Sequence, residues 1–261
     1  MMLNFPEKPE QGMDTTILFS DVATAYATYR PSYPKEIYLV LQSLVPTPAA
    51  AVDVAAGTGI FSRGLQESGY SLTAVEPNTS MRAELEKASS SAPFTVVAGT
   101  AEDTGIPAHS TDLITMAQAF HWVDPEATRT EFQRIGTTTC ITAIVWNSRN
   151  FKETAFMRDY KALLDDYAPA YRTMKNHWSN LDDRVKAFFQ ERYDYHKAAN
   201  IIPINENEMI GNLLSLSYAP PSATTEQDLF IQQARTIFAR HQSDGKVLFD
   251  LTTHLYTGNL T

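Results

Sequence analysis

A short apolar strand that ends in two glycines limits what this chain can fold into more than any other feature. Residues 50–54 are apolar except for Asp53, and the run continues as Ala55-Ala56-Gly57-Thr58-Gly59. Glycines at this spacing let the backbone turn sharply and approach a bound ligand closely, while Asp53 brings a carboxylate to the end of the strand. The run therefore predicts a buried strand followed by a turn that can hold a nucleoside-like cofactor.

Short apolar runs and helical stripes alternate along the first 145 residues. Parallel strands joined by helical crossovers give this order, so we predict an α/β fold, Rossmann-like and doubly wound, with a mostly parallel sheet. The predicted strands are residues 50–54, 72–75, 95–98, 113–117 and 139–145, and the predicted helices between them are residues 61–68, 78–89 and 125–135.

The flanking segments complete the predicted fold. Helices at residues 19–29 and 35–44 are expected to cap the cofactor cleft. From Phe156 to Phe189, and including Trp178, aromatic and charged residues are mixed, which favours helices that form a lid. A helix at 227–240 and an alternating edge strand at 245–256 end the chain. The predicted parts are N-terminal helices at 1–48, a cofactor-binding core at 49–150, a mainly helical lid and substrate region at 151–215, and a C-terminal helix and edge strand at 216–261.

Composition excludes several classes of protein. The chain has 261 residues, 43% of them hydrophobic, and a formal net charge of −9, which argues against a broad nucleic-acid-binding surface. Its single cysteine, Cys140, excludes an intrachain disulfide and a zinc site built from cysteines, and no metal site is predicted. Residues 1–11 lack the features of a signal peptide, and no apolar run reaches membrane length. We expect a cytoplasmic protein with no nucleic-acid or membrane partner; the sequence gives no signal for oligomeric state.

The residues after the glycine turn distinguish two cofactors. A dinucleotide-binding turn has a third small residue at the last position of its fingerprint, where the helix packs close to a pyrophosphate. This chain has Ser62 there, preceded by the bulky pair Ile60-Phe61. S-adenosylmethionine has no pyrophosphate, so its amino-acid end can meet the glycine turn and Asp53 instead. The sequence thus favours the methyl donor over a nicotinamide dinucleotide.

Three further motifs fall at the ends of the next predicted strands. Glu76 ends the second strand, where its carboxylate can accept hydrogen bonds from both ribose hydroxyls of either cofactor. Gly99-Thr100-Ala101-Glu102 follows the third strand and can offer backbone groups and a carboxylate to an adenine edge. The fourth strand runs into Ala117-Gln118-Ala119-Phe120-His121-Trp122, which becomes polar at the predicted cleft. Because ligands of doubly wound sheets bind at the carboxyl ends of the strands, these motifs predict one site.

In this order the motifs resemble those of the class I S-adenosylmethionine-dependent methyltransferases, over residues 19–146. Asp53-x-x-x-Gly57-x-Gly59 resembles the first motif of that family, Val75-Glu76-Pro77-Asn78 its acidic second-strand motif, and Gly99-Thr100-Ala101-Glu102 its adenine segment. Ala119-Phe120-His121-Trp122, with Tyr26-x-x-x-Arg30-Pro31-x-Tyr33-Pro34 upstream, is similar to the small-molecule branch that includes trans-aconitate methyltransferase-like proteins. Ala55-Ala56 replaces the more usual Gly-Cys or similar pair. The resemblance implies seven strands, with the last one antiparallel.

The resemblance also implies which residues hold the cofactor. Asp53 is expected to fix the turn and the amino group at the methionine end, Glu76 the ribose and Glu102 the adenine. Tyr26 and Arg30 lie one helical turn apart and can meet a single anion, from the cofactor or the substrate. The predicted cofactor site comprises Tyr26, Arg30, Asp53, Ala55, Gly57, Thr58, Gly59, Glu76, Pro77, Asn78, Met81, Ala101, Glu102, Ala117, Gln118 and His121.

The acceptor side is predicted from fewer residues. His121 is the candidate catalytic residue because an imidazole exchanges protons near neutral pH; the alternative is a hydrogen-bonding role in the pocket wall. Trp146 and Arg149, after the fifth strand, are predicted to bind the substrate, with a structural role as the alternative. Either Arg30 or Arg149 could orient an anionic acceptor.

We therefore predict an enzyme that transfers a methyl group from S-adenosylmethionine to a small molecule, on oxygen, with a carboxylate as one candidate acceptor. A carboxylate needs no general base because it is already ionised, whereas a hydroxyl or amine may have to lose a proton. Two rival hypotheses share the same motifs: a nicotinamide-dependent oxidoreductase, and a catalytically silent protein that binds S-adenosylmethionine and regulates a partner.

Overall fold

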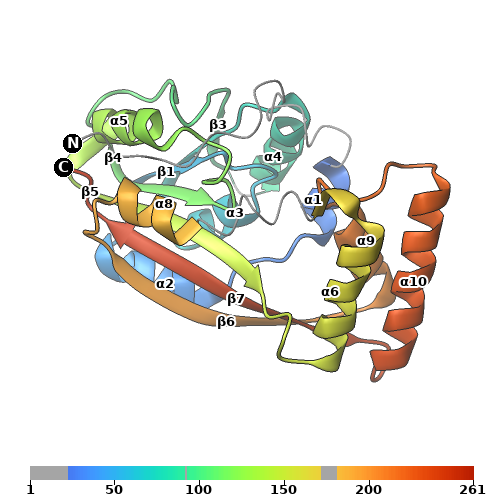
Figure 1. Cartoon of the computed structure of the whole chain (residues 1–261). Coiled ribbons are helices and arrows are strands. Elements are labelled where there is room, and N and C mark those ends of the chain that lie inside the picture. Colours follow the sequence, from blue (N-terminus) through green and yellow to red (C-terminus); the bar gives the residue numbers. More distant parts are fainter. Residues whose placement is uncertain (1–22, 92, 172–180) are drawn as a thin grey trace.

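In the computed structural model, which describes residues 23–91, 93–171 and 181–261, the strands form a mixed sheet in the order β3-β2-β1-β4-β5-β7-β6 (Figure 1). The strands are β1 (Ala50–Val54), β2 (Ser71–Val75), β3 (Thr95–Val97), β4 (Thr111–Ala117), β5 (Gly136–Arg149), β6 (Asp194–Ile204) and β7 (Val247–Gly258). From β3 to β5 all neighbours pair in parallel, and β7 runs antiparallel to both of its neighbours. The predicted seven-stranded, mostly parallel sheet with an antiparallel last strand is confirmed.

The parallel half of the sheet agrees closely with the sequence prediction. β1 spans the predicted residues, and four of its five side chains are buried, as expected for a strand covered on both faces. β2, β3 and β4 begin or end within two residues of the predicted bounds. β5 is longer than predicted and continues to Arg149, where it pairs with β7.

The C-terminal strands depart from the prediction. The predicted edge strand, β7, lies inside the sheet between β5 and β6, so its placement at the edge is wrong. The edge is formed by β6, in a segment that was predicted to be mainly helical and for which no strand was predicted. Most side chains of β6 are exposed, and only Asn200 is buried. A strand with so little alternation between apolar and polar residues gives no period-two signal, which explains why the sequence did not indicate it.

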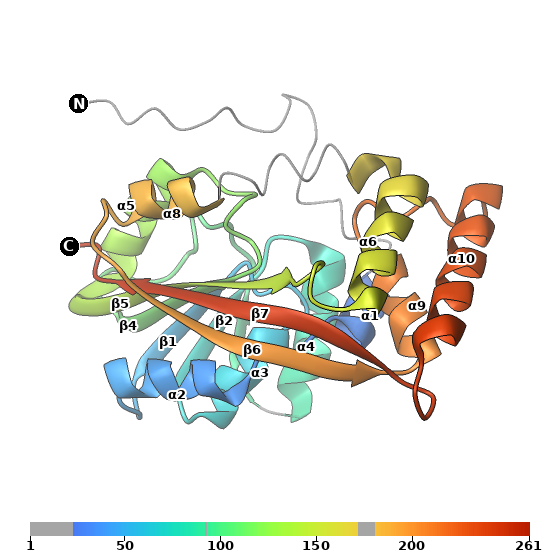
Figure 2. The same ribbon diagram turned by 60° about the horizontal axis from the view of Figure 1, so that its bottom comes forward.

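Helices cover both faces of the sheet (Figure 2). The described helices are α1 (Ala23–Tyr29), α2 (Lys35–Leu44), α3 (Ile60–Glu67), α4 (Thr79–Ser91), α5 (Pro125–Ile135), α6 (Ala155–Tyr167), α8 (Leu181–Phe188), α9 (Glu206–Leu214) and α10 (Thr225–His241). α2 and α3 lie on one face, and α5 and α8 lie on the other. α5 has its predicted bounds because Asp124 caps it by accepting the N–H groups of Glu126 and Ala127, and Pro125 suits its first position.

A third group of helices lies beyond the ends of the long strands (Figure 1). α6, α9 and α10 pack together and share an apolar core with the start of β7, where Phe249 is buried beside Tyr160 of α6. Segment 151–215 therefore supplies strand β6 as well as helices α6, α8 and α9. Two predictions fall partly outside the described residues: residues 19–22 of the first predicted helix, and Trp178.

Candidate active site

A cavity of about 580 Å³ lies at the carboxyl ends of β1, β4 and β5, and Lys161 of α6 and Tyr218, which follows α9, are among the residues that line it. Because β5 and β7 are longer than the parallel strands, they extend along the cavity as one wall. The cavity brings together these predicted site residues: Tyr26, Arg30, Asp53, Ala55, Gly57, Ala117, Gln118, His121, Trp146 and Arg149. The predicted residues that do not line it are Thr58, Gly59, Glu76, Pro77, Asn78, Met81, Ala101 and Glu102.

The two glycines of the turn have different surroundings. Gly57 has a φ of +59°, and a Cβ atom added to it would meet nothing within 4 Å. Gly59 has a φ of +81°, but an added Cβ would lie 2.7 Å from Cδ1 of Leu85 on α4. Gly57 therefore leaves open space at the cavity, whereas Gly59 permits close packing of α3 on α4.

Asp53 is fully buried at the end of β1 and is held by two hydroxyl groups. Ser62 donates a hydrogen bond to Oδ2 at 2.5 Å, and Thr115 donates one to Oδ1 at 2.7 Å. Burial raises the pKa of Asp53 to about 6, against the lowering effect of these two hydrogen bonds. Ser62, whose position weakens the dinucleotide fingerprint, thus orients the carboxylate beside the turn.

Glu76 holds the glycine turn from the neighbouring strand. Its Oε2 accepts the N–H of Gly57 and its Oε1 the N–H of Asn78, both at 2.8 Å. Asn78 in turn caps the start of α4 by accepting the N–H of Met81 at 2.8 Å. Burial raises the pKa of Glu76, although both backbone hydrogen bonds favour the ionised form. The sequence did not indicate this structural contact with Gly57.

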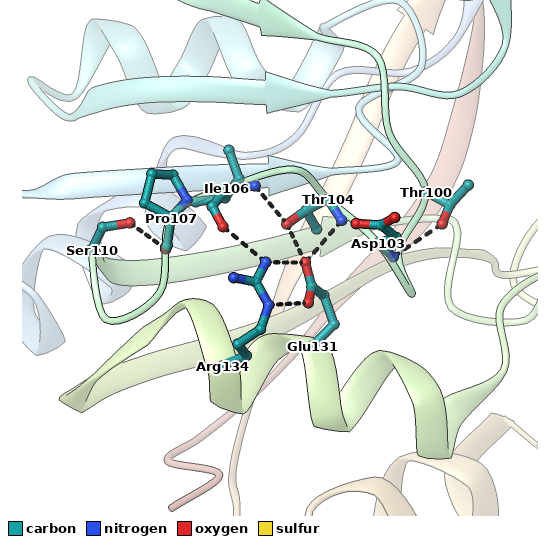
Figure 3. A network of polar contacts seen from close by, with 8 residues as sticks. All are labelled: Thr100, Asp103, Thr104, Ile106, Pro107, Ser110, Glu131 and Arg134. Atoms are coloured by element: carbon teal, nitrogen blue, oxygen red, sulfur yellow. Dashed lines mark hydrogen bonds and ion pairs between the residues drawn. The ribbon is translucent and has the colours of Figure 1, made fainter.

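The segment after β3 is fixed to α5 rather than left as a free loop. Ala101 is buried, and Glu102 accepts the N–H of Asp124 at 2.9 Å. Figure 3 shows the polar network that follows. Glu131 on α5 accepts the backbone and side-chain hydrogen bonds of Thr104 at 2.8 and 2.5 Å, and Arg134 donates to both of its oxygens at 2.7 Å.

Arg134 also donates to the carbonyl of Ile106, so the network of Figure 3 spans the connection between β3 and β4. The hydrogen bonds from Arg134 and Thr104 lower the pKa of Glu131 to about 2, against the effect of burial. The network joins the residues that follow the predicted adenine segment to α5.

His121 lies between two tryptophans at the end of β4. Its ring centroid is 4.3 Å from that of Trp122 and 5.0 Å from that of Trp146 on β5. Gln118, which has a φ of +60°, donates its side-chain amide to the carbonyl of Asn147 at 3.1 Å. These contacts join the ends of β4 and β5 into one wall of the cavity.

Two arginines bring positive charge to the cavity. The guanidinium of Arg30 lies 4.7 Å from the ring centroid of Tyr26 and donates to the carbonyl of Ser215, so the two residues stack one helical turn apart. Arg149 donates to the hydroxyl of Tyr218 at 3.2 Å, and its guanidinium lies over the ring of Phe249. Within the described part of the chain, Nε of each arginine is buried without a hydrogen-bond partner. Both groups therefore retain donors for a bound anion.

Several cavity residues were not predicted from the sequence. They come from β7, α6, α8 and the loops of the third helix group, and include Lys161, Asp182, Tyr218, His254 and Tyr256. They lie far apart in the sequence and form no local motif. One of them could have been found from the sequence: His254 is a titratable residue within the alternating pattern of the last predicted strand.

Comparison with known proteins supports a methyltransferase domain. Residues 52–138 match the sequence profile of a family described as "Methyltransferase domain". An uncharacterised methyltransferase of Mycobacterium tuberculosis is 36% identical over 139 residues, which is 52% of this chain and 55% of the relative. A Dictyostelium discoideum protein assigned as a methyltransferase is 30% identical over 105 residues, 40% of this chain and 39% of that protein. The chain thus spans about half, or less, of the length of these curated relatives.

Solved structures resemble the chain over most of its length. A protein of Anaeromyxobacter dehalogenans assigned as a type II methyltransferase has a TM-score of 0.62 and 19% identity, and the match covers 89% of this chain and 98% of that one. A protein of Anabaena variabilis, assigned as a methyltransferase from an antibiotic biosynthesis pathway, has a TM-score of 0.58 and 17% identity, over 88% and 98% of the two chains. At such identities the likeness concerns the fold.

The chain shares its fold with solved structures assigned as methyltransferases, and residues 52–138 match the family described as "Methyltransferase domain". The family of that domain implies S-adenosylmethionine as the cofactor. In residues 23–91, 93–171 and 181–261, no helix is long and apolar enough to cross a membrane.

Proposed function

We propose that the chain transfers a methyl group from S-adenosylmethionine to an oxygen atom of a small, negatively charged acceptor in the cavity. The observation that carries this proposal is the open space beside Gly57, where an added Cβ would meet no atom within 4 Å although the neighbouring Asp53 and Glu76 are buried. A turn that is held this firmly and still leaves space suits close contact with a ligand. The matched domain and the fold favour the same cofactor.

The chain's own residues fit the chemistry of this cofactor. We assign its amino-acid end to the turn from Ala55 to Gly59 and to Asp53, whose carboxylate oxygens have lone pairs to spare after their two hydrogen bonds. Glu76 is assigned to the ribose, for the same reason. The adenine is assigned to Ala101 and Glu102. The remaining proposed contacts are Tyr26, Arg30, Thr58, Pro77, Asn78, Met81, Ala117, Gln118 and His121.

When bound, S-adenosylmethionine supplies a methyl group on a sulfonium, which already carries its leaving group. The protein then contributes mainly alignment, which can lower the barrier by several kcal/mol and by roughly 7–11 kcal/mol in ideal cases. The walls from β5, β7 and Lys161 of α6 enclose part of the cavity and so reduce the contact of a bound acceptor with water. We assign His121 and Trp146 to the wall that orients the acceptor.

The acceptor is inferred from the charge of the cavity. Arg149 and Arg30 each keep a buried donor, and a guanidinium binds a carboxylate well. This supports a small acid, in line with the resemblance to the branch that includes trans-aconitate methyltransferase-like proteins. A cytoplasmic location and the absence of nucleic-acid and membrane partners stay predictions from the sequence.

Ligand-induced stabilisation tests the cofactor. S-adenosylhomocysteine at about 100 times its Kd should stabilise the fold by about 2.7 kcal/mol, which raises Tm by about 5–11 °C for a chain of this size. Stabilisation by NAD instead would favour the oxidoreductase hypothesis. If S-adenosylhomocysteine binds but labelled S-adenosylmethionine transfers no methyl group to a broad panel of acids, phenols and amines, the regulatory hypothesis replaces the enzyme.

A further inference from the structure

A second polar cluster lies in the cavity wall, and the proposed function does not use it. It consists of Ser148 on β5, His254 on β7 and Tyr195 on β6. Ser148 and His254 line the cavity. Tyr195 is not among the lining residues and is 46% exposed. The imidazole therefore connects a hydroxyl in the cavity with a hydroxyl that is open to solvent.

The strand register explains how the three side chains meet. Trp146 of β5 is directly opposite His254 of β7, and Tyr195 of β6 is directly opposite Tyr256 of β7. Side chains two residues apart on a strand share a face, so Ser148 and Tyr195 approach the imidazole from the strands on its two sides. Oγ of Ser148 lies 2.7 Å from Nε2 of His254, and the hydroxyl oxygen of Tyr195 lies 2.7 Å from Nδ1. Both distances are typical of good hydrogen bonds.

Trp146 connects this cluster to the strand ends where the proposed methyl donor binds. Its ring contacts His121, at the end of β4, with the centroids 5.0 Å apart. The same tryptophan is the ladder partner of His254. The cluster therefore belongs to the part of the cavity wall that adjoins the carboxyl ends of the parallel strands.

We propose that His254 is the general base that removes the proton from a hydroxyl acceptor, either aliphatic or phenolic. This proposal rests on the proposed function, because it requires the methyl donor in the same cavity. The acceptor oxygen forms its bond to the methyl carbon, and the bond from that carbon to sulfur breaks with its electron pair left on sulfur. The acceptor proton passes to Ser148 Oγ as the Ser148 proton passes to Nε2 of His254. Tyr195 accepts the hydrogen bond of Nδ1–H in the resulting imidazolium, which loses its Nε2 proton to solvent once the product has left, so that the starting tautomer is restored.

The charged groups around His254 act on its pKa in opposite directions. Burial lowers the pKa of His254 below its ordinary value of 6.5; Asp182 on α8 opposes this shift, and Lys197, directly opposite on β6, adds to it. Tyr256 donates its hydroxyl to Asp182 at 2.7 Å. A neutral imidazole at physiological pH can accept a proton, as a general base must.

Two other titratable side chains are candidates for this role, and their contacts differ from those of His254. Burial raises the pKa of Tyr195, so its phenol is neutral near pH 7 and can only exchange protons in concert with the imidazole. The ring of His121, which follows β4, contacts that of Trp146. Among the groups on the three strands, His254 alone holds hydrogen bonds to both Ser148 and Tyr195.

The neighbouring Arg149 narrows the class of acceptor. Ser148 and Arg149 are successive residues of β5, yet both line the cavity, so the cavity extends around the end of this strand. A molecule with a hydroxyl for Ser148 and a carboxylate for Arg149 satisfies both. The class of acceptor is therefore a hydroxy acid or phenolic acid, methylated on the hydroxyl and held by the carboxylate.

The tautomer of His254 tests the base directly and without turnover. In protein labelled with ¹⁵N in histidine, and with His254→Gln to identify the signal, we expect the proton on Nδ1 and a bare Nε2 that accepts from Ser148. Ser148→Ala should shift the Nε2 resonance, and Tyr195→Phe should move the proton toward Nε2. His196→Gln, at an exposed position of β6, is the matched control and should change neither. A proton on Nε2 in the wild-type protein would overturn the proposal.

Kinetics separate a base from a structural role. With labelled S-adenosylmethionine and phenolic or aliphatic hydroxy acids, His254→Gln should lower kcat by about 10²–10⁴-fold and leave S-adenosylhomocysteine affinity unchanged. Tyr195→Phe should cause a smaller loss and shift the pH profile. If His254→Gln lowered kcat equally with hydroxyl acceptors and with acids that lack a hydroxyl, the general-base role would be overturned and the proposed function would stand. Failure of the wild-type protein to bind S-adenosylhomocysteine would overturn the proposed function and the base together.

Discussion

Gly57→Ala probes the cofactor site with a change that the protein without ligand tolerates. The φ of Gly57 is +59°, and the added Cβ meets nothing within 4 Å. The substitution therefore lowers the free energy of unfolding only through the left-handed backbone, by about 1–2 kcal/mol. For a chain of this length, that corresponds to a fall in Tm of about 2–8 °C.

The chain offers a matched control at Gly245. This residue has a φ of +73°, an added Cβ there also meets nothing within 4 Å, and the residue lies in the turn between Ser243 and Lys246, outside the cavity. Gly245→Ala should therefore cost a similar free energy of unfolding. Urea unfolding of both variants measures that cost.

Calorimetric titration with S-adenosylhomocysteine then separates the two variants. Gly57→Ala places a methyl group in the space assigned to the cofactor, next to the N–H that Glu76 holds, and should weaken binding at least about tenfold, or about 1.4 kcal/mol. Gly245→Ala should leave the affinity unchanged. Equal affinities in the two variants would refute the assignment of the open space, and a much larger stability loss for Gly57→Ala would refute the claim that this space is free.

Three further predictions concern stability. Gly59→Ala combines a strained left-handed backbone with a Cβ that lies 2.7 Å from Leu85, and in urea unfolding it should lower the free energy of unfolding by about 2–4 kcal/mol. A loss no larger than that of Gly57→Ala would contradict the packing role of Gly59. For Glu131, a pKa lowered from 4.5 to about 2 corresponds to about 3 kcal/mol, and because Arg134 is 43% exposed we expect about 1–2 kcal/mol. This contribution is full above about pH 4.5 and is lost as pH falls toward 2, so the stability difference between wild type and Glu131→Gln should shrink over that range; a constant difference would contradict it. For Asp53, a pKa raised from 3.8 to about 6 stabilises the fold below pH 3.8, and this stabilisation is lost as pH rises through 6. The free energy of unfolding of the wild type should therefore fall by up to about 3 kcal/mol across this interval, whereas that of Asp53→Asn should not. Parallel pH curves of the two proteins would contradict the shift.

The part of the cavity proposed to bind the methyl donor could be located from the sequence because each of its segments is contiguous in the sequence. The strand at residues 50–54, the turn at Gly57 and the strand end at Ala117 are local signals, and parallel strands bring their carboxyl ends together whatever lies between them. The same logic located α5, whose cap and first proline are adjacent in the sequence.

The part of the cavity proposed to bind the acceptor depends on strand pairing that no local sequence pattern encodes. Ser148 and His254 are 106 residues apart and meet because β7 pairs with β5, and Tyr195 reaches the same imidazole because β6 pairs with the other side of β7. The strand that displaces β7 from the edge, β6, carries mostly exposed side chains and so lacks alternation. A prediction that places β7 at the edge cannot bring Tyr195 to His254, and the hydrogen-bonded cluster is lost with it.

The sequence assigned Asp53 and Glu76 to the cofactor, but in the structure each also holds the protein's own backbone or hydroxyl groups. Asp53 joins β1 to Ser62 and Thr115, and Glu76 joins β2 to the N–H of Gly57. Removing either carboxylate therefore disturbs the turn and any ligand contact together, and a loss of affinity would not distinguish the two causes. Gly57 has no side chain to lose and its Cβ direction is open, so it is the position at which ligand contact and turn stability can be measured separately.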